Sequence, residues 1–139
     1  SVFCNKDMVW RDTAHPNLGF WAIEAWHGDI YLGRCGDNPG DAAVVRYSDK
    51  KTVLQMPEHS VIHDLAIDKK TDTLIAFVNK GPNGAVVMAT KNGDNWYLMD
   101  QGFTVPDIFD GYYDDVEDAI YLATGQFGGN GRIYRSVRR

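Results

Sequence analysis

The chain has 139 residues, the length of one globular domain with a sizeable core. Its formal net charge of −5 argues against nucleic acid or an anionic membrane surface as the main partner. No apolar run approaches the roughly 18 residues that a membrane-spanning helix needs.

Short apolar or alternating runs recur along the whole chain, and this pattern predicts strands rather than helices. In chain order the predicted strands span 8–12, 19–24, 29–33, 43–48, 52–56, 61–66, 73–77, 85–90, 95–99, 108–113, 119–123 and 131–136. Turn formers rich in Gly, Asn, Asp and Pro separate many of these strands. The longer turns lie at 38–41, 81–84 and 128–131, after the second strand of each copy described next.

The strands form three similar copies, the last of them one strand short. A period of about 40–45 residues with four short strands per copy is typical of β-propeller blades. The sequence therefore predicts an all-β fold with a single domain over 1–139. Its blades would span 17–57, 58–101 and 104–139, with residues 1–13 as an outer strand for a third blade. The first strand of each blade would be innermost, with both faces packed.

Three blades do not close a ring, since closed propellers have about four to eight. Two chains would supply six, and the N-terminal strand around Trp10 would then complete the third blade of the partner. We therefore predict a homodimer closed by strand exchange. The alternative is a fragment of a longer propeller.

One hairpin carries a family resemblance. Residues 89–96 read Ala-Thr-Lys-Asn-Gly-Asp-Asn-Trp, which resembles the Asp-box of sialidase-type (BNR) repeats, Ser-x-Asp-x-Gly-x-Thr-Trp. Gly93 and Trp96 match, whereas Lys91 stands in place of the aspartate. The resemblance implies a β-propeller fold. The Phe/Tyr-Arg-Ile-Pro motif of the sialidase arginine site does not occur, so sialidase activity is not predicted.

Three carboxylates, Glu24, Asp64 and Asp110, align at equivalent points of the predicted inner strands. If they face the axis, a six-bladed ring presents six carboxylates around one opening. Such oxygens can ligate calcium or accept hydrogen bonds from sugar hydroxyls. The alternative is that each one caps backbone amides of its own strand.

Aromatic side chains lie on or near the same strands. Trp21, Trp26 and Tyr112 could stack on the C–H face of a sugar, and His63 lies beside Asp64. The alternative is that these rings belong to the core, with His63 as a structural histidine. Cys4 and Cys35 allow one disulfide, or they remain two free thiols.

The like residues at like positions favour a non-enzymatic module that binds glycan or protein surfaces through repeated sites. We predict a lectin-like, adhesion or virion component, secreted or on a virion surface. We predict no cofactor, and calcium is the one metal ion that the carboxylates could bind. The alternative is a hydrolase or lyase that acts on a sugar or phosphate at the axis through Asp64 and Asp110.

Overall fold

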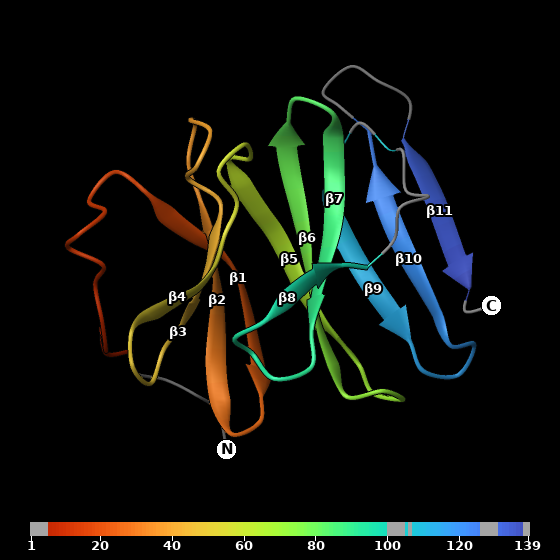
Figure 1. Cartoon of the computed structure of the whole chain (residues 1–139), viewed down its shortest axis with the longest axis horizontal. Helices are drawn as coiled ribbons and strands as arrows, with labels where there is room; N and C mark the ends of the chain where they lie inside the picture. The colour runs from red at the N-terminus through yellow and green to blue at the C-terminus, as the bar shows by residue number, and fades with distance from the viewer. Residues whose placement is uncertain (1–5, 100–104, 106, 126–130, 138–139) are drawn as a thin grey trace.

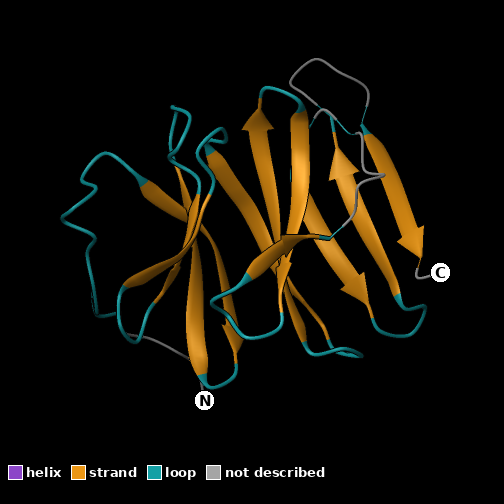
Figure 2. Cartoon of the chain, in the orientation of Figure 1, coloured by secondary structure: helices purple, strands orange, loops and turns teal. Residues whose placement is uncertain are grey.

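The structure is a computed structural model that describes residues 6–99, 105, 107–125 and 131–137. These residues form eleven strands and no helix, so the all-β prediction is confirmed (Figure 2). Each strand overlaps a segment that the sequence predicts as a strand. The described part of the chain contains no helix with the length and apolar character that a membrane crossing requires.

The first four strands form an antiparallel meander in which each strand pairs with the next. They are β1 (Gly19–Trp26), β2 (Asp29–Cys35), β3 (Ala43–Arg46) and β4 (Lys51–Gln55). We call this meander sheet 1.

Sheet 2 repeats the same arrangement with β5 (Val61–Asp68), β6 (Thr73–Gly81), β7 (Gly84–Thr90) and β8 (Trp96–Leu98). One residue pair, Cys35 with Val61, joins β2 to β5, so sheets 1 and 2 form a single curled eight-stranded sheet.

Sheet 3 has three strands among the described residues: β9 (Asp110–Asp114), β10 (Ala119–Thr124) and β11 (Arg132–Val137). Figure 1 shows the three sheets side by side, with β1, β5 and β9 first in each.

Two hydrophobic cores separate the sheets. The first core lies between sheets 1 and 2, and the second lies between sheets 2 and 3. Strand β6 supplies both, because alternate side chains of a strand point to opposite faces. Leu74, Ala76 and Val78 enter the first core, while Ile75 and Phe77 enter the second. Sheet 2 is therefore packed on both faces.

The strand that is buried on both faces is β6, where seven consecutive residues from Thr73 to Asn79 are buried. The prediction that the first strand of each repeat has this property is wrong. In β5, the first strand of the middle sheet, His63, Asp64, Ala66 and Ile67 are only half-buried. The cause is position: β6 lies between β5 and β7, whereas β5 pairs with β6 on one side and with β2 through a single residue pair on the other.

Two glycines allow the sheets to approach closely. A Cβ at Gly33 of β2 would lie 2.6 Å from Ile62 Cγ2 of β5, and a Cβ at Gly111 of β9 would overlap the Phe77 ring of β6. Sheet 1 therefore contacts sheet 2 through Gly33, and sheet 2 contacts sheet 3 through Gly111.

Residues 6–18 contain no strand in the single chain. The strand predicted around Trp10 would form only against the third blade of a second copy, so it stays a prediction. Cys35 is buried and forms no disulfide with any described residue, and burial raises the pKa of its thiol. Cys4 lies outside the described residues, so its pairing stays open.

Candidate binding site on the first strands

Two of the first strands contain an irregularity at the same place. The register of β1 against β2 shifts between Phe20 and Ala22, and the register of β5 against β6 shifts between Ile62 and Asp64. A β-bulge leaves one residue without a cross-strand partner and re-aims its side chain. The residues re-aimed in this way are Trp21 and His63.

The bulge residues bring three rings into a row. The centroids of Trp21 and His63 are 5.3 Å apart with an edge-on geometry, and those of His63 and Phe109 are 5.1 Å apart in the same arrangement. Edge-to-face contacts at such distances are favourable between aromatic rings. Trp21 lies in sheet 1, His63 lies in sheet 2, and Phe109 directly precedes β9 of sheet 3. Trp21 is 62% exposed and Phe109 36%, so the row borders solvent.

Two carboxylates lie beside the ring row. The backbone N–H of Gly111 donates to Asp64 Oδ2 at 3.2 Å and to Asp110 Oδ1 at 2.9 Å. Asp64 Oδ1 also accepts a hydrogen bond from the backbone of Leu65 at 2.8 Å. One amide therefore holds together two acids that are 46 residues apart in the chain.

This arrangement raises the pKa of Asp64 to about 7. Burial is the main cause, and the hydrogen bond with Asp110 is the next, since two neighbouring carboxylates share a proton more easily than both ionise. Near neutral pH the Asp64 carboxyl is therefore partly protonated and can donate a hydrogen bond. Such behaviour is typical of functional sites, although structural networks also produce it.

His63 and Asp107 add polar atoms without partners. His63 Nε2 and Asp107 Oδ2 are both buried and have no hydrogen-bond partner among the residues that the structure describes. Burial lowers the pKa of His63, and the charge of Lys80 lowers it further. Buried polar atoms usually find a partner, so a buried water is expected at these two atoms.

The register places Glu24 apart from the other two carboxylates. Three cross-strand pairs are equivalent in the three sheets. They are Ala22 with Gly33 in sheet 1, Asp64 with Phe77 in sheet 2, and Asp110 with Ala123 in sheet 3. The residue of β1 equivalent to Asp64 is therefore Ala22, and the alignment with Glu24 is shifted by two residues. Glu24 pairs with Tyr31 further along β1.

Trp26 and Tyr112 also lie away from the ring row. Trp26 is 4% exposed in the first core, where its indole Nε1 donates to Asp72 Oδ1 at 2.8 Å. Tyr112 is 62% exposed on β9, opposite Tyr121 of β10. Of the seven residues proposed from the sequence, the structure brings together Trp21, His63, Asp64 and Asp110.

The sequence reasoning missed Phe109, which completes the row of rings. The signal was present, because Phe109 precedes Asp110 as His63 precedes Asp64. For metal binding, the described residues offer no group of three or more His, Cys, Asp or Glu side chains placed to hold an ion.

No protein-family model, no curated protein and no solved structure matches the chain.

Proposed function

We propose that the three sheets are consecutive blades of a β-propeller and that the chain forms half of a six-bladed ring. Three features support this proposal: sequential antiparallel pairing within each sheet, face-to-face cores between successive sheets, and the repeated bulge on the first strands. Blades of a propeller pack in this way around an axis lined by their first strands.

The two end faces of the half-ring support closure by a second copy. On the free face of sheet 1, Ile23 is 66% exposed and Ile30 37%. On the free face of sheet 3, Tyr112 is 62% exposed and Ile133 76%. Exposed apolar faces of this kind mark interaction surfaces. Sheet 3 of one copy would pack on sheet 1 of the other, as sheets 1 and 2 already do within the chain.

Light scattering on a size-exclusion column tests the ring. We expect the native protein to have about twice the 15.6 kDa mass of the chain. The variant Ile133→Glu places a charge in the proposed interface and is expected to give a monomer. Val116→Glu is the matched control, because Val116 is 90% exposed in the turn between β9 and β10. A monomeric wild-type protein would overturn closure by a second copy.

The function that the site supports best is non-enzymatic recognition of a glycan or a protein surface. The single observation that carries this proposal is the row Trp21–His63–Phe109 beside Asp64 and Asp110. Exposed ring faces stack on the C–H faces of sugars, and carboxyl groups exchange hydrogen bonds with hydroxyls. Two copies of the row on one ring would give avidity, as suits a lectin-like, adhesion or virion component.

Binding to an array of immobilised glycans, followed by calorimetry on the strongest hit, tests this function. Trp21→Ala is expected to weaken binding roughly tenfold, because one stacking contact contributes about 1 kcal/mol and two copies act together. Tyr97→Ala is the control, since Tyr97 is also exposed but lies on the outer strand β8. Equal binding by both variants would place the ligand elsewhere.

A hydrolase or lyase is the second candidate, favoured by the raised pKa of Asp64. A carboxyl that is partly protonated near neutral pH can act as a general acid, with Asp110 as its partner. The variant Asp64→Asn distinguishes the enzyme from the binding module. An enzyme would lose turnover and keep ligand affinity, whereas a binding module has no turnover to lose.

A further inference from the structure

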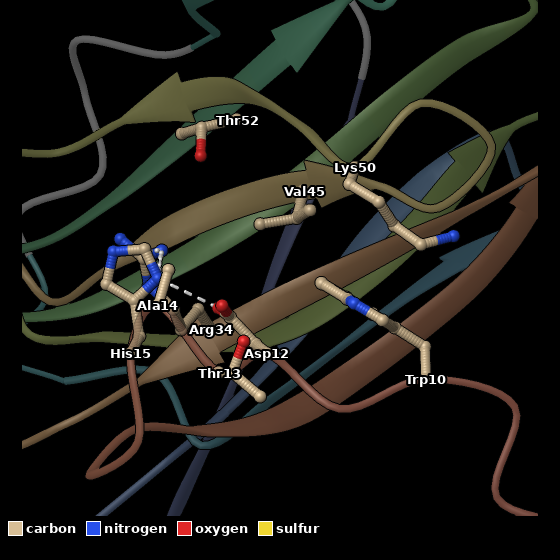
Figure 3. A pocket seen from close by; sticks show the side chains of 9 residues that line it. All are labelled: Trp10, Asp12, Thr13, Ala14, His15, Arg34, Val45, Lys50 and Thr52. Carbon is tan, nitrogen blue, oxygen red and sulfur yellow. Dashed lines mark hydrogen bonds and ion pairs between the residues drawn. The ribbon is translucent and has the colours of Figure 1, made fainter.

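A cavity lies on the outer face of sheet 1, and none of the residues that line it belongs to the ring row. The N-terminal segment crosses the outer face of this sheet over β2, β3 and β4, and leaves a cavity of about 240 Å³ beneath it (Figure 3). We call this cavity the N-terminal cleft. It is lined by Trp10, Asp12, Thr13, Ala14, His15, Arg34, Val45, Lys50 and Thr52.

A buried guanidinium forms one end of the cleft. Arg34 is only 4% exposed, and its Nε donates to the backbone carbonyl of Asp41 at 3.1 Å. Its Nη1 lies 3.3 Å from His15 Nδ1 and 3.4 Å from His15 Nε2, and His15 Nδ1 lies 2.9 Å from Asp12 Oδ2. The imidazole of His15 therefore stands between the guanidinium and the Asp12 carboxylate.

The hydrogen bonds that hold Arg34 in place leave some of its N–H groups unused. A guanidinium has five N–H groups, and the contacts of Arg34 with described residues use Nε and Nη1. Nη2 has no hydrogen-bond partner among those residues, and it is not fully buried. Since Arg34 lines the cleft, we infer that Nη2 opens into it.

An aromatic ring and an ammonium group form the other end. Trp10 packs on Phe20 with ring centroids 5.5 Å apart. The Lys50 ammonium lies 5.3 Å from the Trp10 ring centroid and 3.6 Å from that of Tyr47. In Figure 3 Trp10 and Lys50 stand opposite Arg34 and His15, with Val45 on the sheet behind them. The cleft therefore joins an apolar wall to two cations.

We propose that the N-terminal cleft binds a small single-ring carboxylate. Its carboxylate would accept hydrogen bonds from Arg34 Nη2, and its ring would lie between Trp10 and Val45. The size fits, because the cavity is below the roughly 300–1,000 Å³ of sites for drug-sized ligands. The lining shares no residue with the ring row. The cleft lies on the free face of sheet 1, which a second copy would approach in the proposed ring, so this proposal rests on the N-terminal segment keeping its place on that face.

The lining favours an anion that carries a ring. The two cations Arg34 and Lys50 outnumber the single carboxylate of Asp12. Trp10 and Val45 offer apolar surface that a ring would cover and that an inorganic phosphate would leave bare.

Titration of the full chain with benzoate tests the proposal, with the Trp10 indole N–H followed by NMR. We expect a saturable shift with a dissociation constant of about 1 mM. Benzamide has the same shape without the charge and is expected to bind at least tenfold more weakly. Inorganic phosphate is also expected to bind more weakly than benzoate.

Two variants probe opposite ends of the cleft. Arg34→Lys keeps the charge but loses the planar fork, and Trp10→Ala removes the wall in a segment that contains no strand. Each is expected to weaken benzoate binding about tenfold. Binding to Trp10→Ala is measured by calorimetry, because this variant lacks the indole signal. Lys51→Ala, which changes the neighbour of Lys50 outside the cleft, is expected to leave affinity unchanged. Absence of a saturable shift, equal binding of benzamide, or unchanged affinity in both variants would each overturn the proposal.

Discussion

Replacing Phe77 by alanine is expected to lower the free energy of unfolding by about 3–5 kcal/mol. Phe77 is among the largest side chains that are completely buried, and it lies in the second core, where its ring packs against the backbone of Gly111. Removal of the ring loses its transfer free energy and leaves a cavity between sheets 2 and 3. Urea unfolding at one fixed protein concentration measures the change.

The contact between Phe77 and Gly111 is open to a sharper test. Gly111→Ala alone is expected to cost about 1–3 kcal/mol, because its Cβ would overlap the Phe77 ring. In the double variant Phe77→Leu/Gly111→Ala the smaller side chain makes room, so the combined loss should fall below the sum of the two single losses. Gly131→Ala is the control, since nothing lies within 4 Å of its added Cβ. Additive losses would contradict direct contact between the two positions.

The strands could be predicted because their signals are local. In β10 and β7, short apolar runs end at turn-forming residues, and neither feature depends on distant parts of the chain. Burial was harder to predict, because it depends on which sheet lies opposite. The apolar run of β6 is buried on both faces, while Ile23 of β1 is similar in chemistry and exposed.

The candidate site could be predicted only in part. Strand β1 has Ala22 where β5 has Asp64 and β9 has Asp110, so the repeat of acids is broken in sheet 1, and the alignment took the next acid along, Glu24, in its place. Trp21, His63, Asp64 and Asp110 were found because acidic or aromatic residues recur at those points. Their contacts join three different sheets, and no local pattern encodes such distances.

The carboxyl pair is expected to make the fold less stable as the pH rises. The pKa of Asp64 is about 7 in the folded chain, against an ordinary value near 4 when unfolded. A raised pKa means that the folded state holds the proton more tightly. The stability associated with that proton is complete below pH 4 and is lost as the pH rises towards 7 and above. Asp64→Asn removes this dependence, since its amide stays neutral at every pH.

We therefore expect Asp64→Asn to be more stable than the wild type by about 1–3 kcal/mol at pH 8, and close to it at pH 4. Asp29→Asn is the control of opposite sign. Hydrogen bonding from Ser48 lowers the pKa of Asp29, so its variant should lose stability at pH 7 and recover relative to the wild type as the pH falls. Urea unfolding at several pH values measures both.

The sign of this effect bears on function. A stability cost at two neighbouring acids beside the ring row would support the proposed ligand site. If Asp64→Asn gains no stability at pH 8, the acids do not share a proton, and they act only as acceptors for the Gly111 amide. If the gain appears and the array ligand is lost in the same variant, the pair serves recognition.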